Sequence, residues 1–156
     1  MKAIIIYDDF DLAIKASAAL ARSLPQDHLT IEWHISPWRT KILKFPAAAV
    51  EALNDAADAH MIVFAGTGLL TPWLWDWMER WVRLRQVKDP VLAVIAADDI
   101  GDVSLSSSPD ITRFAWRHGL DCLSDASAVS LDALEFLPAA FPGHIPAGAA
   151  VTSTTN

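Results

Sequence analysis

Short apolar runs alternate along the chain with stretches that are amphipathic or rich in alanine. Five runs have the length of strands, and the second alternates apolar Ile31, Trp33 and Ile35 with polar neighbours, as an edge strand does. The expected strands are Lys2–Tyr7, Leu29–Ile35, Met61–Ala65, Val91–Ala97 and Leu120–Leu123. Such alternation is typical of a parallel sheet with helices on both faces.

The stretches between these runs carry the start and stop signals of helices. Pro46 and Pro72 suit the first turn of a helix, and Gly119 suits the residue after its end. The expected helices are Asp11–Leu24, Ala47–Ala59, Pro72–Arg85, Asp110–His118 and a short one that contains Ser130, Asp132, Leu134 and Leu137. A polar loop is expected between the fourth strand and Pro109. We expect one domain over residues 1–142 and a polar tail over 143–156.

Five strands joined by right-handed crossovers predict a doubly wound α/β domain with a five-stranded parallel sheet. The expected strand order is 2-1-3-4-5, the flavodoxin-like order. The loops that follow the strands then meet at one edge of the sheet, where α/β proteins bind their ligands. They are Asp8-Asp9, Trp38-Arg39, Gly66-Thr67-Gly68, Asp98-Asp99 and Ser124-Asp125.

Composition narrows the classes of partner. The 156 residues suffice for one domain, and a hydrophobic fraction of 53% excludes disorder. A formal net charge of −7 opposes binding to nucleic acid or anionic lipid. The single cysteine, Cys122, forms no internal disulfide, and no window approaches the ~20 apolar residues that span a membrane. We therefore expect a cytoplasmic protein with neither nucleic-acid nor membrane partners.

Three segments resemble the receiver domain of two-component response regulators: Ile4–Asp9, Pro90–Asp99 and His118–Leu123. The resemblance extends over about Met1 to Leu137. It implies that Asp8 and Asp9 stand where the family holds a magnesium ion. It also implies that Ala65-Gly66 stands where the family carries its phosphoacceptor aspartate.

Two further positions depart from the family pattern. Ala96-Ala97 replaces the family's hydroxyl residue, and Ser124-Asp125 replaces its lysine. The resemblance therefore implies a receiver that cannot be phosphorylated, which acts as a non-catalytic module for protein interaction and signalling.

The acidic pair has three other interpretations. Asp8, Asp9 and Asp11 stand where aspartates cap a helix N-terminus. Arg39 or Lys41, just beyond the neighbouring strand, could pair with these carboxylates in place of a metal. A divalent cation on Asp8 and Asp9 could also support hydrolysis or phosphoryl transfer, although no nucleophile or third ligand is visible.

The turn Gly66-Thr67-Gly68 is the strongest sequence argument for a cofactor. Glycine turns expose backbone N–H groups beside a helix N-terminus, and with Trp38 they form a candidate site for FMN or a nucleotide. The stretch Gly66–Trp77 resembles the third-strand loop of flavodoxin-like FMN reductases, although acidic residues replace that family's phosphate loop. A plain chain reversal is the alternative. Trp38 also lies beside Arg39, Lys41 and Lys44, a basic and aromatic cluster able to contact an anion.

The segment from Pro72 to Arg85 predicts a contact with another protein. Trp73, Trp77 and Trp81 lie on one stripe, and Trp75 and Val82 widen its apolar arc beyond what one sheet face covers. We expect a protein interface here, most simply a homodimer. The alternatives are a core helix with bulky packing and a tryptophan that stacks on a ligand.

Overall fold

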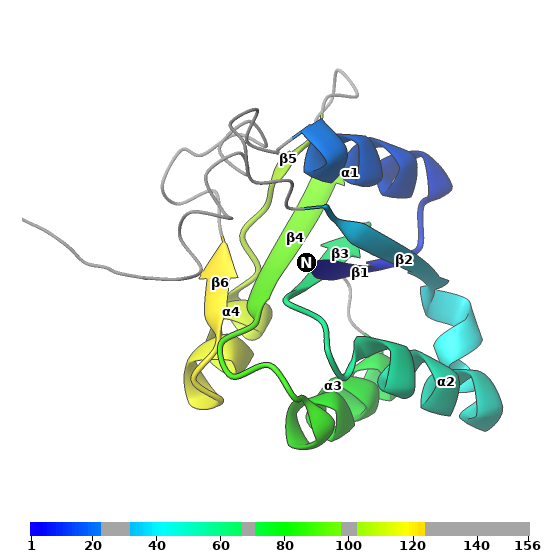
Figure 1. The fold of residues 1–156 in the computed structure, drawn as a ribbon, viewed down its shortest axis with the longest axis vertical. Helices are drawn as coiled ribbons and strands as arrows, with labels where there is room; N and C mark the ends of the chain where they lie inside the picture. Colours follow the sequence, from blue (N-terminus) through cyan, green and yellow to red (C-terminus); the bar gives the residue numbers. More distant parts are fainter. Residues whose placement is uncertain (23–31, 67–70, 98–102, 124–156) are drawn as a thin grey trace, which may run out of the picture.

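The structure is a computed structural model and describes residues 1–22, 32–66, 71–97 and 103–123. It is an α/β fold, a sheet with helices on both faces (Figure 1). The strands are β1 (Lys2–Tyr7), β2 (His34–Arg39), β3 (Met61–Ala65), β4 (Val91–Ala97), β5 (Val103–Leu105) and β6 (Asp121–Leu123).

The strand order is β2-β1-β3-β4-β5, which is compatible with a flavodoxin-like fold. β1, β2, β3 and β4 are parallel, and β6 pairs in parallel with Val91–Ala93 of β4. The next part of β4, Ile95–Ala97, pairs with β5 in the antiparallel direction. The predicted order of the first four strands is confirmed. The prediction of a wholly parallel sheet is wrong because β5 was expected to be loop.

The sequence did not predict β5 because the strand is short and is flanked by polar residues. Leu105 is 2% exposed and provides its apolar anchor. Ser106 N–H donates to Val94 O at 2.7 Å and extends the pairing. A three-residue strand on an open sheet edge is stabilised by that edge, and its own sequence carries little periodic signal.

β2 lies later in the chain than the predicted Leu29–Ile35. It pairs with β1 from Lys2↔His34 to Tyr7↔Arg39 and includes Pro37. Proline is tolerated there because an edge strand leaves one row of N–H positions unpaired. Trp33, which the prediction placed inside the strand, lies just before it and is 8% exposed.

The described residues contain four α-helices and one 3₁₀ helix. They are α1 (Phe10–Arg22), η1 (Thr40–Lys44), α2 (Pro46–Ala56), α3 (Pro72–Leu84) and α4 (Pro109–Arg117). Proline opens α2, α3 and α4, and Gly119 adopts a φ of 66° after α4, as the sequence indicates. The helix expected near Ser130 and the boundary expected at residue 142 lie outside the described residues.

Each sheet face carries its own apolar core. Ile4, Ile6, Ile62 and Phe64 point to the face covered by α2, α3 and α4, where they join Trp77 and Trp81. Ala3, Ile5 and Val63 point to the opposite face, where they join alanine and leucine side chains of α1. The alternation along β1 and β3 thus separates the two cores, as the pleat of a doubly covered sheet requires. No helix in the described ranges has the length and apolar character needed to cross a membrane.

Candidate functional site

The carboxyl edge of the sheet holds the acidic pair, and its two members have different roles. Asp9 caps α1, because its Oδ1 accepts hydrogen bonds from Asp11 N–H at 2.9 Å and Leu12 N–H at 3.3 Å. This satisfies backbone donors that a helix start leaves free. The capping interpretation is therefore confirmed for Asp9.

Asp8 lies against Gly66, at the end of β3. Asp8 N–H donates to Ala65 O at 3.2 Å, and Gly66 N–H donates to Ile95 O at 3.2 Å, so both backbones are held in the sheet edge. A Cβ atom at position 66 would overlap the Asp8 carboxylate. Gly66 is therefore required by close approach of a side chain, in addition to any role as a turn.

We expect Gly66→Ala to lower the free energy of unfolding by about 1–2 kcal/mol, because the Asp8 carboxylate must leave its place. Chemical denaturation of Gly66→Ala, Asp8→Ala and the double variant measures the coupling energy between the two residues. Gly66→Ala should lower the free energy of unfolding by less when Asp8 is already alanine. Equal costs in the two backgrounds would show that the two residues are not in contact.

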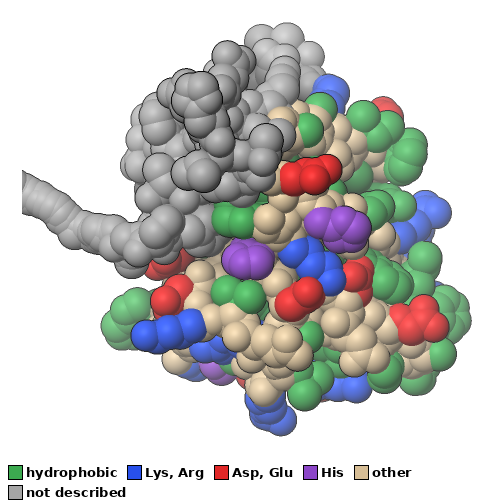
Figure 2. All heavy atoms as spheres, viewed as in Figure 1, with side chains coloured by type: hydrophobic (Ala, Val, Ile, Leu, Met, Phe, Trp, Pro, Cys, Tyr) green, Lys and Arg blue, Asp and Glu red, His purple; other side chains and the backbone are tan. Residues whose placement is uncertain are grey.

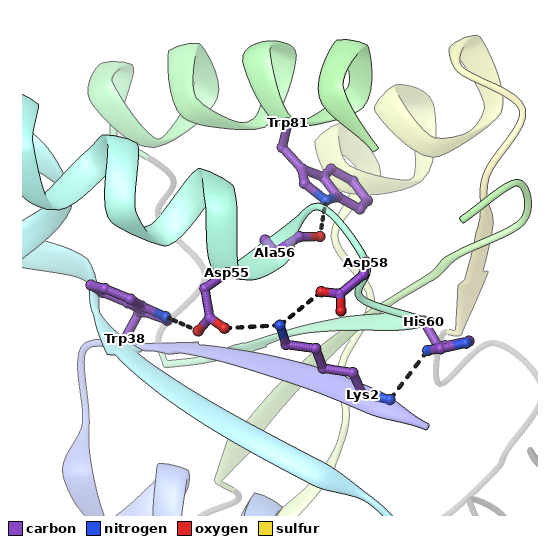
Figure 3. A network of polar contacts seen from close by, with 7 residues as sticks. All are labelled: Lys2, Trp38, Asp55, Ala56, Asp58, His60 and Trp81. Atoms are coloured by element: carbon purple, nitrogen blue, oxygen red, sulfur yellow. Dashed lines mark hydrogen bonds and ion pairs between the residues drawn. The ribbon is translucent and has the colours of Figure 1, made fainter. Parts of the chain in front are cut away.

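The side chain of Trp38 contacts α2. Its indole N–H donates to Asp55 Oδ2 at 2.8 Å, and the ring packs against the core beneath α2 (Figure 3). Thr67 and Gly68 lie outside the described residues. The structure engages the Trp38 N–H in a protein contact, and the cofactor site at Gly66, Thr67, Gly68 and Trp38 stays a prediction.

The Trp38 contact belongs to a polar network that the sequence did not predict. Lys2 Nζ lies 2.9 Å from Asp55 Oδ1 and 2.7 Å from Asp58 Oδ1, and Lys2 N–H donates to His60 Nδ1 at 3.1 Å (Figure 3). Figure 2 shows cationic, acidic and histidine side chains gathered around the start of β1. The contacts of Lys2 join residues more than 50 positions apart and Trp38 is 17 positions from Asp55, so no local pattern indicates them.

The network stabilises the charged forms of Lys2 and Asp55, which does not suit proton transfer. Burial alone would lower the pKa of Lys2, but hydrogen bonds and charges from Asp58 and Asp55 outweigh it and raise that pKa. Burial likewise opposes ionisation of Asp55, but hydrogen bonds from Trp38 and Lys2 and the Lys2 charge lower its pKa. A general acid or base needs a pKa near the working pH. These shifts favour a structural role.

His60 completes the network as a neutral acceptor. Burial lowers its pKa, the positive N-terminus lowers it further, and the charge of Asp58 opposes both. The imidazole thus keeps Nδ1 free of a proton and able to accept from Lys2 N–H.

The described residues do not form the ion pair considered for the acidic pair with Arg39 or Lys41. Arg39 lies opposite Tyr7 in the strand register, yet within the described ranges neither Arg39 nor Lys41 makes an ion pair with Asp8 or Asp9. The same ranges contain no group of three or more His, Cys, Asp or Glu side chains placed to hold a metal. Asp98, Asp99 and Asp125, which the sequence places at this edge, lie outside them.

Two of the three tryptophans expected at an interface are core residues. Trp77 is 1% exposed and its N–H donates to Ala49 O at 3.2 Å; Trp81 is 0% exposed and donates to Ala56 O at 2.9 Å. Both bonds tie α3 to α2, at Ala49 in its first turn and at Ala56 at its end. The core-helix alternative is correct for these two residues. Trp73 remains 37% exposed and donates to Thr40 O at 3.4 Å.

A hollow lies between α3 and α4. Its volume is about 350 Å³, and its lining includes Trp75, Phe114, Arg113 and Arg117. Its cations are already paired, Arg113 with Asp110 at 3.5 Å and Arg117 with Glu79 at 2.6 Å. The hollow therefore presents little unbalanced charge to a ligand.

Cys122 is half-buried in β6. Burial raises the pKa of its thiol, and a weak contact from Thr112 at 4.0 Å opposes the shift. A raised thiol pKa reduces the thiolate on which nucleophilic chemistry depends. The place of Cys122 in β6 therefore favours a structural role.

Comparison with known proteins finds no matching family model, no matching curated protein and no matching solved structure. An α/β fold of this strand order hosts many functions. The function is therefore argued from the residues of the carboxyl edge and the surfaces beside it.

Proposed function

We propose that the protein is a receiver-like module that acts by contact with another protein and takes no phosphoryl group. The observation that supports the proposal is the close approach of the Asp8 carboxylate to Gly66. In the receiver family the end of this strand bears the acceptor carboxylate. Here that position has no side chain, and the Asp8 carboxylate fills the space that one would need.

The chemistry of the described residues also favours binding over catalysis. One carboxylate oxygen of Asp9 accepts the hydrogen bonds that cap α1. The Lys2 and Asp55 network has pKa shifts that keep its charges fixed. The thiol of Cys122 is not activated. Large apolar side chains such as Phe10 (64% exposed) and Phe45 (57% exposed) reach the surface, and exposed aromatic residues suit a protein contact.

Binding of a flavin or nucleotide is the competing function. Its phosphate would meet Asp8, Asp9 and Asp11 at the start of α1, where the charges are of the wrong sign. Trp38 is one of the residues predicted to bind the cofactor, and its indole N–H donates to Asp55. We therefore rank this function second.

Intact-mass analysis after incubation with magnesium and acetyl phosphate tests the proposal. We expect the polypeptide mass to stay unchanged, because Gly66, at the acceptor position, carries no carboxylate of its own. A phosphorylatable receiver in the same tube shows that the donor is active. An adduct of one phosphoryl group, mapped to Asp8, Asp9 or another aspartate of this edge, would overturn the proposal.

A further inference from the structure

The segment from Arg39 to Phe45 sorts its side chains into three rows. A 3₁₀ helix has three residues per turn, so positions three apart share one side. Thr40 and Leu43 form the inner row, where Leu43 is 3% exposed. Lys41 and Lys44 form a second row, and Ile42 lies on the third side, between the extended cap residues Arg39 and Phe45 in the sequence.

The outer rows expose apolar area that the fold leaves uncovered. Ile42 is 41% exposed and Phe45 is 57% exposed. Trp73, at the start of α3, is joined to η1 through its bond to Thr40 and adds an indole that is 37% exposed. Ile42, Phe45 and Trp73 thus form an apolar surface close to the carboxyl edge of the sheet. We name it, with Arg39, Lys41 and Lys44, the η1 surface.

The charge of the η1 surface is opposite to that of the chain. Residues 39–44 contain three cations and no acid, in a protein with a formal net charge of −7. Within the described ranges Arg39, Lys41 and Lys44 form no ion pair, and Lys44 lies 5.3 Å from the centre of the Phe45 ring. The cations are therefore available to an external anion.

We infer that the η1 surface binds an acidic segment of a partner protein that carries apolar side chains. This inference rests on the proposed function and names the chemistry of its partner. Cations beside aromatic rings match carboxylates beside leucine or phenylalanine. An extended polyanion, such as a bilayer or a nucleic acid, would also meet the negative charge of the rest of the chain.

Fluorescence anisotropy with labelled peptides tests the inference on the full chain. The probes are acidic peptides with leucines at helical or extended spacing, and matched peptides in which serine replaces every leucine. We expect a leucine-containing peptide to bind and its serine partner to bind at least about tenfold more weakly. Absence of binding by every leucine-containing peptide would overturn the inference.

Matched variants locate the site. Arg39→Glu/Lys41→Glu/Lys44→Glu and, separately, Phe45→Ser should each weaken binding about tenfold or more. The controls are Arg83→Glu/Lys88→Glu and Phe10→Ser, which change exposed residues elsewhere. Circular dichroism confirms that each variant is folded. Equal loss in the controls would contradict a specific surface.

Two other occupants give distinct results. Sedimentation with phosphatidylserine vesicles, abolished by the same triple variant, would overturn the inference in favour of a membrane. A dimer in light scattering that the triple variant dissociates would overturn it in favour of a second copy. Failure of peptide binding leaves the acetyl phosphate result standing, and a phosphoryl adduct leaves the peptide result standing, so the two proposals fail separately.

Discussion

Replacement of Trp81 by alanine is expected to lower the free energy of unfolding by about 3–5 kcal/mol. The side chain is 0% exposed, so truncation leaves a large cavity between α2, α3 and the sheet. It also removes the donor to Ala56 O at the end of α2. Denaturant titration followed by circular dichroism measures the change.

Trp116 provides the matched control for Trp81. It is also a helical tryptophan, but it is 85% exposed. Trp116→Ala should change the free energy of unfolding by no more than about 0.5 kcal/mol. Similar losses in the two variants would contradict the burial assigned to α3. If Trp81→Ala does not fold, Trp81→Phe should still fold and should lose less stability, because it fills most of the cavity.

Asp55→Ala is expected to cost about 1.5–3 kcal/mol of stability. The change removes the acceptor of the Trp38 indole and one of the two carboxylates that hold Lys2. Asp58→Ala removes the other carboxylate, whose side chain is 58% exposed, and should cost at most about 1 kcal/mol. Thermal and urea unfolding at neutral pH compare the two variants, and a larger loss for Asp58→Ala would contradict the network.

The pH dependence of the Asp55 effect has a definite sign. The pKa of Asp55 is lowered in the folded state, so its ionised form contributes stability fully above its ordinary value of 3.8. As the pH falls below that value, the carboxylate binds a proton and the contribution is lost. The difference in stability between the wild type and Asp55→Ala should therefore be constant near neutral pH and should narrow in acid.

Most of the fold could be predicted from local patterns. Met61–Ala65 and Val91–Ala97 are apolar at nearly every position and lie in the middle of the sheet, so their bounds were predicted exactly. β2 could not be placed as well. It lies at an edge, where burial is weak and the partner strand sets the register. Pro37 is tolerated inside β2 because an edge strand leaves one row of N–H positions unpaired.

The site was less predictable because its contacts are long-range. The pattern of α3 shows that Trp77 and Trp81 share a stripe, but α2 decides whether that stripe is core or interface. Trp38 follows a strand end, yet Asp55 on α2 decides where its indole points. Arg39, Ile42 and Phe45 follow one another at intervals of three residues in the sequence. These intervals indicate the η1 surface only once residues 40–44 are known to form a 3₁₀ helix.

A native mass spectrum of the purified chain tests the central claim most directly. The claim is that the protein acts by contact, without a bound cofactor and without a phosphoryl group on its carboxyl edge. We predict that each copy of the chain has the mass of the polypeptide alone, whether it is observed as a monomer or in an assembly. A mass increased by a flavin, a nucleotide or a phosphoryl group would contradict the claim and direct attention to the turn that begins at Gly66.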